Sequence, residues 1–221
     1  MSNTSRNAIL ERIRSASNEG SADHVRDRAA DYAALPRDYI RAEEMDEAAR
    51  LRMLVERLRE YDAGVHSASA RKFPDALSAV IAEILTRRGK KRLAVPAGLP
   101  LSWLPAGFDF IQADRLSPLE IDRFDGIVTG CTAAIALTGS LVLQNAPGQG
   151  PRALSLVPDY HLCVVFPEQV VSTVSEAFDR LAATATLPTT FISGPSATAD
   201  IEMKRIKGVH GPRFLDVVLV A

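Results

Sequence analysis

Short apolar runs alternate with helix-like segments along the chain from Gly64 onward. Residues 65–69, 92–95 and 108–112 are short and rich in apolar or β-branched side chains, as strands are. Between the first two runs, residues 73–89 repeat apolar side chains on one helical face and end at a glycine. Strands that alternate with helices predict an α/β domain in which helices flank the sheet.

Three further apolar runs, 126–129, 133–137 and 140–143, follow one another too closely to be joined by crossover helices. At least one pair of them should therefore form a hairpin, which makes the expected sheet mixed rather than purely parallel. The remaining pattern predicts short helices at 118–123 and 152–157, a strand at 162–166, a helix at 170–183, and strands at 189–193 and 214–220.

Residues 1–63 carry a different pattern, which is helical and charged. An apolar stripe recurs at helical spacing over residues 45–61, and a weaker one runs over residues 9–16. Residues 20–36 have few large apolar side chains, so a linker is as consistent with them as a helix. We expect a helical N-terminal arm over 1–63, suited to oligomerisation or partner docking, and one α/β domain over 64–221.

The composition favours a folded protein without a strongly charged partner. Hydrophobic residues make up 47% of the 221 residues, which is enough for a core, and the net charge is -1. Because positive and negative charges are interspersed, no basic face is available for nucleic acid or an anionic membrane. The N-terminus lacks the apolar segment of a signal peptide, and no apolar run reaches about 18 residues, as a membrane span requires. We therefore expect a soluble cytoplasmic protein with no nucleic-acid partner.

The chain has two cysteines, Cys131 and Cys163, and neither belongs to a CxxC pattern. An iron–sulfur cluster normally takes four thiolates, so this chain alone cannot hold one. No spacing of histidines and carboxylates resembles a zinc site, and we predict no metal and no cofactor in this chain. Cys163 should be a core residue, and Cys131 would be a nucleophile only beside a base that the sequence does not reveal. His161 opens a predicted strand, where a histidine is more often structural than catalytic.

The polar stretch between the last two predicted strands is the main candidate for chemistry. It holds Asp200, Glu202 and His210 as candidate catalytic residues, and Arg213 as a forked cation for a carboxylate or phosphate. Histidine titrates near neutral pH and suits proton transfer, whereas two carboxylates two residues apart share one side of an extended segment. Such groups seldom lie between core strands unless their loops converge on a ligand. Candidate ligand-binding residues in the same stretch are Ser196, Thr198 and Gly211.

Each of these residues also has a purely structural interpretation. Asp200 can cap a helix, as can Ser196 or Thr198, in which case the side chain only accepts hydrogen bonds from backbone N–H groups. His210 lies between glycines in GVHGPR and can be a hydrogen-bonded residue of a tight turn before the last strand. The sequence leaves both interpretations open.

Two glycine-containing turns are further candidates for holding an anion. Thr138, Gly139 and Ser140 lie between two apolar runs, where glycine lets successive N–H groups point at an anion beside two hydroxyls. An ordinary hairpin turn is the more common explanation. Asn145 and Gly148 lie in a glycine-proline loop that runs into a predicted helix, whose N-terminus attracts anions. This loop matches neither a P-loop nor a dinucleotide fingerprint, so a plain surface loop is the alternative.

Three stretches, residues 128–143, 147–165 and 194–220, together resemble the LUD-domain family of lactate utilisation protein C. The most distinctive part is the motif GPS-x-T-x-DIE followed by GVHGP. The resemblance covers the C-terminal part of the chain, and the helical N-terminal part is also similar to that family.

The resemblance implies an α/β core related to the sugar-phosphate isomerase and CoA-transferase type of fold. It also implies a role in oxidising L-lactate to pyruvate, together with iron–sulfur clusters carried by separate partner subunits. On this basis we expect an accessory subunit that binds a small anionic metabolite, either as a single chain or as a homo-oligomer. A stand-alone enzyme for a phosphorylated or CoA-linked small molecule, and a purely structural partner, are the alternatives.

One departure from the family pattern bears on transferase chemistry. Many members carry an acidic residue just before the Thr-Gly turn and another after the position of Cys131, where this chain has Leu137 and Thr132. CoA transferases on related folds work through a glutamate that forms a covalent thioester. Without a carboxylate at either position transferase chemistry is disfavoured, and Glu202 is the remaining candidate near a motif.

Overall fold

The computed structural model describes residues 3–18, 28–36, 44–198, 206–207 and 211–221. The chain separates into two compact units, Met1–Tyr39 and Ile40–Ala221. The first unit contains helices α1 (Asn3–Asn18) and α2 (Arg28–Ala33). The division falls before helix α3 (Glu47–Glu60), not at the expected boundary between residues 63 and 64, because α3 packs into the core of the second unit.

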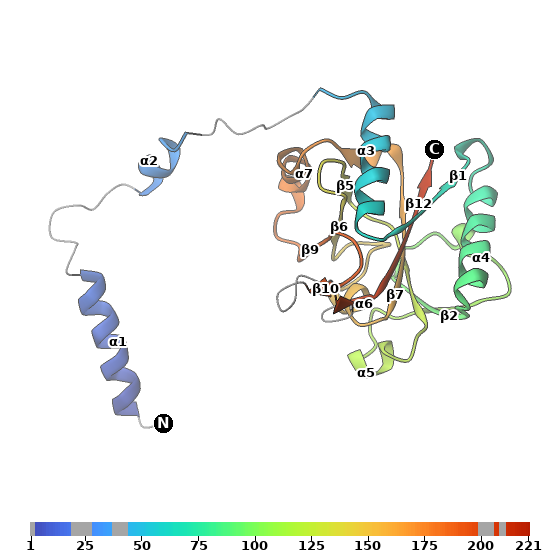
Figure 1. Cartoon of the computed structure of the whole chain (residues 1–221). Helices are drawn as coiled ribbons and strands as arrows, with labels where there is room; N and C mark the ends of the chain where they lie inside the picture. Colours follow the sequence, from blue (N-terminus) through green and yellow to red (C-terminus); the bar gives the residue numbers. More distant parts are fainter. Residues whose placement is uncertain (1–2, 19–27, 37–43, 199–205, 208–210) are drawn as a thin grey trace. The chain divides into compact units, whose positions relative to one another are not determined.

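Six parallel strands form the main sheet of the second unit (Figure 1). The strand order is β1-β12-β7-β4-β2-β3, and each neighbouring pair is parallel. This arrangement confirms the predicted α/β domain. The strands are β1 (Gly64–Ala68), β2 (Arg92–Val95), β3 (Asp109–Gln112), β4 (Gly126–Thr129), β7 (Tyr160–Val165) and β12 (Phe214–Val220).

A separate four-stranded sheet holds the predicted hairpin. Strands β5 and β6 are antiparallel, with Ala133 opposite Val142, and the sheet order is β8-β5-β6-β9. The mixed pairing that we expected in one sheet is therefore confined to this second sheet, in which β5 also runs parallel to β8. Its strands are β5 (Ala133–Ile135), β6 (Ser140–Gln144), β8 (Val170–Val171) and β9 (Thr189–Ile192), and a two-stranded ribbon pairs β10 (Ala197–Thr198) with β11 (Ile206–Lys207).

Helices α3 and α4 (Asp75–Arg88) cover opposite faces of the parallel sheet (Figure 1). Side chains alternate between the two faces along a strand. In β12, Val218 belongs to the apolar cluster of α4, whereas Val217 and Leu219 pack in the same cluster as Leu58 of α3. Two apolar clusters, one on each face, thus hold these helices to the sheet.

Helix α7 (Val174–Leu181) begins at Val174 and not at residue 170, where the sequence pattern placed its start. Residues 170–171 instead form β8 and pair with β5. A reciprocal cap fixes the start of the helix: Glu176 N donates to Thr173 Oγ1 at 3.2 Å, and Ser172 N donates to Glu176 Oε2 at 2.8 Å. The other helices of this unit are α5 (Pro118–Ile121) and α6 (Arg152–Leu156), with single 3-10 turns at Ala70–Lys72, Leu101–Trp103, Pro167–Gln169 and Ala182–Thr184.

The substitution Leu58→Ala tests how much the packing of α3 contributes to the stability of the domain. Leu58 is fully buried, so its truncation should lower the free energy of unfolding by about 3 kcal/mol, because it removes apolar contacts and leaves a cavity. Urea denaturation followed by circular dichroism measures the change. Leu10→Ala, on an exposed position of α1, is the matched control and should cost less than about 0.5 kcal/mol. Equal, small costs for both substitutions would contradict the packing of α3.

Candidate functional site

The three residues predicted to be catalytic, Asp200, Glu202 and His210, lie outside the described residues. The structure does describe segments on either side of them. Strand β10 pairs antiparallel with β11, so that the backbone of Thr198 lies opposite that of Ile206. The chain therefore approaches and leaves residues 199–205 along a two-stranded ribbon.

Two of the candidate ligand-binding residues, Ser196 and Gly211, are neighbours in space. The Ser196 N–H donates a hydrogen bond to the Pro212 carbonyl at 2.8 Å. Gly211 has a φ of 124°, a conformation that favours glycine, and a Cβ on it would lie 3.7 Å from the Ser196 Cβ. The two flanks of the polar stretch thus meet at this point.

Arg213 lies just before β12, and its guanidinium is already paired. Its Nη2 lies 3.0 Å from Oδ2 of Asp159, and its Nε contacts the other carboxylate oxygen. The hydrogen bond with Asp159 raises the pKa of Arg213. An anion bound here would share Arg213 with the Asp159 carboxylate or displace it.

The turn at Thr138, Gly139 and Ser140 joins β5 to β6 and packs against α3. Gly139 has a φ of 60°, and a Cβ on it would lie 2.7 Å from the Cβ of Arg57, so glycine is required there. Its N–H approaches a carbonyl of the same turn at 3.4 Å. The hydroxyls form a chain, because Ser140 Oγ lies 2.8 Å from Thr138 Oγ1 and 2.7 Å from Ser193 Oγ. The geometry is that of a hairpin turn whose hydroxyls reach the segment leading into β10.

Asn145 and Gly148 lie at the opposite end of β6 from that turn. The strand has five residues, which corresponds to about 16 Å. The Gly148 N–H donates to the Ala97 carbonyl at 2.7 Å, and the Gly148 carbonyl accepts from Gly130 N–H at 2.8 Å. These bonds join the glycine-proline loop to the loops after β2 and β4. A small anion at the Thr138–Ser140 turn would not reach Asn145 or Gly148.

His161, Cys131 and Cys163 are buried and have the environment of core residues. His161 Nε2 lies 2.7 Å from Thr129 Oγ1, and burial lowers the pKa of the imidazole to about 4, so the ring is neutral near neutral pH. The neighbouring Cys163 thiol and burial raise the pKa of Cys131. Cys131 is therefore not an activated nucleophile, and Cys163 is the core residue that we predicted.

Both thiols should be protected in the folded protein. We expect labelling by DTNB to be at least about 100-fold slower in the native state than in guanidinium chloride, because reaction requires opening of the core and a thiolate. Absorbance of the released chromophore measures the rate. Rapid labelling of one thiol in native protein would contradict the buried placement of Cys131 and Cys163.

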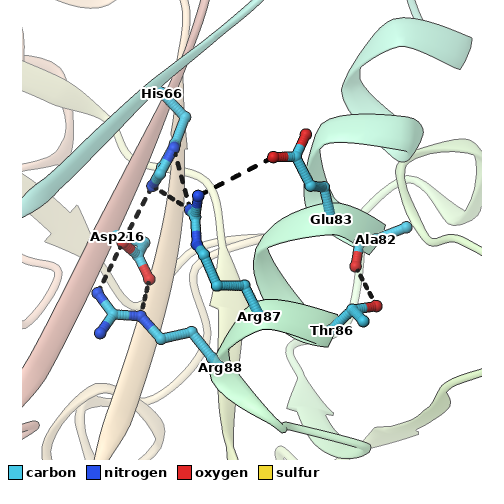
Figure 2. A network of polar contacts seen from close by, with 7 residues as sticks. All are labelled: His66, Ala82, Glu83, Thr86, Arg87, Arg88 and Asp216. Atoms are coloured by element: carbon cyan, nitrogen blue, oxygen red, sulfur yellow. Dashed lines mark hydrogen bonds and ion pairs between the residues drawn. The ribbon is translucent and has the colours of Figure 1, made fainter.

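A polar network at the C-terminal end of α4 joins three segments that are far apart in the sequence (Figure 2). Asp216, on β12, has a buried carboxylate that contacts residues of the other two segments, β1 and α4. Arg88 donates from Nε to Oδ2 at 2.8 Å and from Nη2 to Oδ1 at 3.0 Å. His66, on β1, lies with Nε2 at 3.1 Å from Oδ1. Arg87 Nη2 lies 3.5 Å from each ring nitrogen of His66.

The network keeps Asp216 ionised inside the fold. Burial alone would raise the pKa of Asp216, but the hydrogen bonds from Arg88 and His66 outweigh burial, and the pKa is lowered. Burial and the charge of Asp216 together raise the pKa of the neighbouring Tyr160. The absence of a side chain at Gly64 leaves space for the Asp216 carboxylate, since a Cβ at position 64 would lie 1.9 Å from Asp216 Oδ1.

Sequence patterns do not reveal this network, because His66 and Asp216 are 150 residues apart. One signal was present: Asp216 is a charged residue within the apolar strand sequence FLDVVLV. A carboxylate in a buried strand requires a cation or several donors. That requirement alone would have directed attention to a basic residue on a covering helix, although not to Arg88 in particular.

A cavity of about 780 Å³ lies between α3 and the carboxyl ends of β1 and β12. Its charged lining consists of two arginines and two glutamates, which balance each other and do not favour an anion. The lining residues are Leu51, Arg52, Val55, Glu56, Arg59, Glu60, Ser67, Leu219 and Ala221.

Within the described ranges, no group of three or more His, Cys, Asp or Glu residues is arranged to hold a metal ion. None of the helices in those ranges is long and apolar enough to cross a membrane.

Several known proteins are similar to this chain. Residues 119–220 match the LUD domain. Lactate utilization protein C of Deinococcus radiodurans is 41% identical over 179 residues, which cover 80% of this chain and 82% of that protein. A protein of the same name from Halalkalibacterium halodurans is 34% identical over 111 residues, or 48% of this chain and 47% of that protein. The crystal structure of a DUF162 family protein from Deinococcus radiodurans has a TM-score of 0.69 and 37% identity, covering 80% of this chain and 100% of that one. The chain therefore belongs to the LUD-domain family, together with the proteins called lactate utilization protein C.

Proposed function

We propose that this chain is an accessory subunit in the oxidation of L-lactate to pyruvate, and that iron–sulfur clusters on separate subunits carry the electrons. The observation behind the proposal is the 41% identity, over 80% of the chain, to a protein named lactate utilization protein C. The cysteine count supports the division of labour, because two cysteines are fewer than the four thiolates that a cluster normally takes. The complex is proposed to be cytoplasmic, and the fold to be related to the sugar-phosphate isomerase and CoA-transferase type.

The ligand proposed for this subunit is a small anion at the junction between the Thr138–Ser140 turn and the polar stretch after β9. Two contacts support this location. The Ser140 hydroxyl bonds to that of Ser193, and the Ser196 N–H bonds to the Pro212 carbonyl. One hydrogen bond thus joins the turn to Ser193, and a second, three residues further along the chain, joins the entry of the polar stretch to its exit.

Each residue of the proposed site has a role that fits its chemistry. The hydroxyls of the Thr138–Ser140 turn donate to the anion, and Arg213 supplies countercharge that it shares with Asp159. Asp200 and Glu202 orient hydroxyl or amine groups of the ligand. His210 exchanges a proton with it, since imidazole can give and take a proton near neutral pH.

Two substitutions test this site while preserving side-chain size: His210→Gln and Asp200→Asn. Each should leave folding intact and lower L-lactate-dependent reduction of an artificial electron acceptor, in a complex reconstituted with the iron–sulfur subunits, by at least about 100-fold. Asp109→Asn, an exposed position on β3, is the control and should keep the full rate. Full activity of both site variants would contradict the site and leave the subunit role standing.

Thermal unfolding with L-lactate, pyruvate, phosphate, CoA and nucleotides tests the ligand class. A ligand at about 100 times its dissociation constant stabilises the protein by about 2.7 kcal/mol. We expect stabilisation by L-lactate or pyruvate. Stabilisation by phosphate or CoA alone, followed by turnover in the isolated chain, would support a stand-alone enzyme for a phosphorylated or CoA-linked molecule. No stabilisation by any of them would support a purely structural partner.

A further inference from the structure

We propose that His66 and Arg87 form a second anion site, which binds a small carboxylate with a hydroxyl group on the neighbouring carbon. The site lies at the C-terminal end of α4 (Figure 2). It is on the face of the sheet opposite to α3, whereas the Thr138–Ser140 turn packs against α3. It is therefore separate from the site of the proposed function and does not depend on it.

Asp216 fixes which nitrogen of His66 faces the ligand. An ionised carboxylate only accepts hydrogen bonds, so the proton shared with Asp216 Oδ1 belongs to Nε2 of His66. In the neutral ring Nδ1 then carries a lone pair and accepts a hydrogen bond. In the part of the chain that the structure describes, the one polar neighbour of Nδ1 is Arg87 Nη2 at 3.5 Å, too long for a strong bond. The His66 side chain is 21% exposed, so part of it is in contact with solvent.

Arg87 supplies the positive charge that a carboxylate requires. Its side chain is 54% exposed, and its guanidinium makes a loose pair with Glu83 at 3.9 Å, whose side chain is 76% exposed. Exposed pairs of this kind contribute little, so Arg87 can turn to a carboxylate at small cost. Arg88, next to it, is held by two hydrogen bonds to Asp216. Arg88 therefore compensates the buried charge of Asp216, and Arg87 is available to a ligand.

Arg87 and His66 together select a ligand that carries a hydrogen-bond acceptor and a hydrogen-bond donor on neighbouring atoms. Arg87 only donates hydrogen bonds, neutral His66 accepts one at Nδ1, and the two nitrogens lie 3.5 Å apart. A carboxylate beside a hydroxyl-bearing carbon satisfies both, with the carboxylate on Arg87 and the hydroxyl proton directed at Nδ1. A plain carboxylate satisfies Arg87 alone, and a 2-oxo acid has no proton for Nδ1. Asp216 accepts the hydrogen bond from Nε2 and so makes Nδ1 a better acceptor for the hydroxyl.

A titration with L-lactate and propionate, a pair that differs in one hydroxyl group, tests the site in the isolated full-length protein. The readout is the imidazole signal of His66 in proton–nitrogen NMR spectra, assigned by its loss in His66→Leu and followed where the spectrum shows the ring neutral. We expect L-lactate to bind about five- to tenfold more tightly than propionate, as one added hydrogen bond predicts. Arg87→Gln should weaken both ligands by at least about fivefold.

His66→Leu is the decisive variant, because leucine offers no lone pair in place of Nδ1, while Arg88 still donates two hydrogen bonds to Asp216. It should fold normally and bind the two ligands equally, which backbone amide shifts of neighbouring residues report. Arg115→Gln removes an exposed arginine after β3, at the far edge of the sheet, and should leave both affinities unchanged. Equal affinity for L-lactate and propionate in the unmodified protein, or a preference that persists in His66→Leu, would overturn the site. Because no electron transfer is measured, this result is independent of the His210 experiments.

Discussion

Replacing Arg88 with leucine is expected to lower the free energy of unfolding at neutral pH by about 3 kcal/mol. Arg88 donates two hydrogen bonds to Asp216, whose side chain is 1% exposed. Loss of one partner of a buried ion pair leaves the other charge without compensation and typically costs about 3–5 kcal/mol. We expect the lower end because the Arg88 side chain is 33% exposed and part of its interaction is screened by solvent. Urea denaturation measures the loss.

The same substitution should reverse the pH dependence that Asp216 gives to stability. In the unmodified chain its pKa is lowered, so its contribution is present above the unfolded pKa of about 4 and is lost as the pH falls through the folded pKa. Without Arg88, burial dominates and raises the pKa, so stability is lost instead as the pH rises above about 4. The deficit of the variant should therefore be largest at neutral pH and shrink toward acid.

Arg87→Leu is the control for this prediction. Arg87 is the preceding residue of α4 and is half-exposed, and its contacts are with His66 and Glu83, at 3.5 and 3.9 Å. Its replacement should change the free energy of unfolding by less than about 0.5 kcal/mol. A deficit in Arg88→Leu that is the same at acid and neutral pH would show that packing, and not the charge of Asp216, accounts for the loss.

A methyl group at position 64 should be about as damaging as the loss of Arg88. In Gly64→Ala the new Cβ would lie 1.9 Å from Asp216 Oδ1 and 3.2 Å from His66 Nε2. The carboxylate must move, and its hydrogen bonds lengthen or break while the charge stays buried. We expect a loss of about 3 kcal/mol, measured by urea denaturation.

A double-mutant cycle shows whether that loss acts through Asp216. In an Asp216→Ala background the clashing oxygen is gone, and Gly64→Ala should cost less than about 1 kcal/mol. Gly130→Ala is the control, because the nearest atom to a Cβ at that position would lie 3.8 Å away. This substitution should change the free energy of unfolding little. An equal cost of Gly64→Ala in both backgrounds would contradict our account of why glycine occupies this position.

The order and type of most elements follow from the sequence because periodicity reports burial directly. The helix-spaced apolar residues near Leu58 and the short runs at 92–95 and 126–129 became α3, β2 and β4. What periodicity does not report is which strands share a sheet. The run at 133–137 contains β5, which pairs with β6 in a separate sheet. Residues 170–171 form β8 in that same sheet, because α7 begins only after its cap at Thr173.

The candidate site was less accessible to sequence reasoning for a physical reason. Local patterns find residues that lie close together along the chain, such as the Thr138–Ser140 turn, which is indeed a hairpin turn. They do not find pairs that tertiary structure creates, such as His66 with Asp216 or Arg213 with Asp159. In both pairs only the fold identifies the cation that the carboxylate meets.

Lactate oxidation measured with and without this chain tests its role as an accessory subunit most directly. The extract should come from a strain that lacks other lactate-oxidising enzymes and from which the gene for this chain has been deleted. We predict that L-lactate-dependent reduction of an artificial electron acceptor falls to background in this extract and returns when the purified chain is added back. Undiminished L-lactate oxidation in the deletion extract would contradict the proposed function.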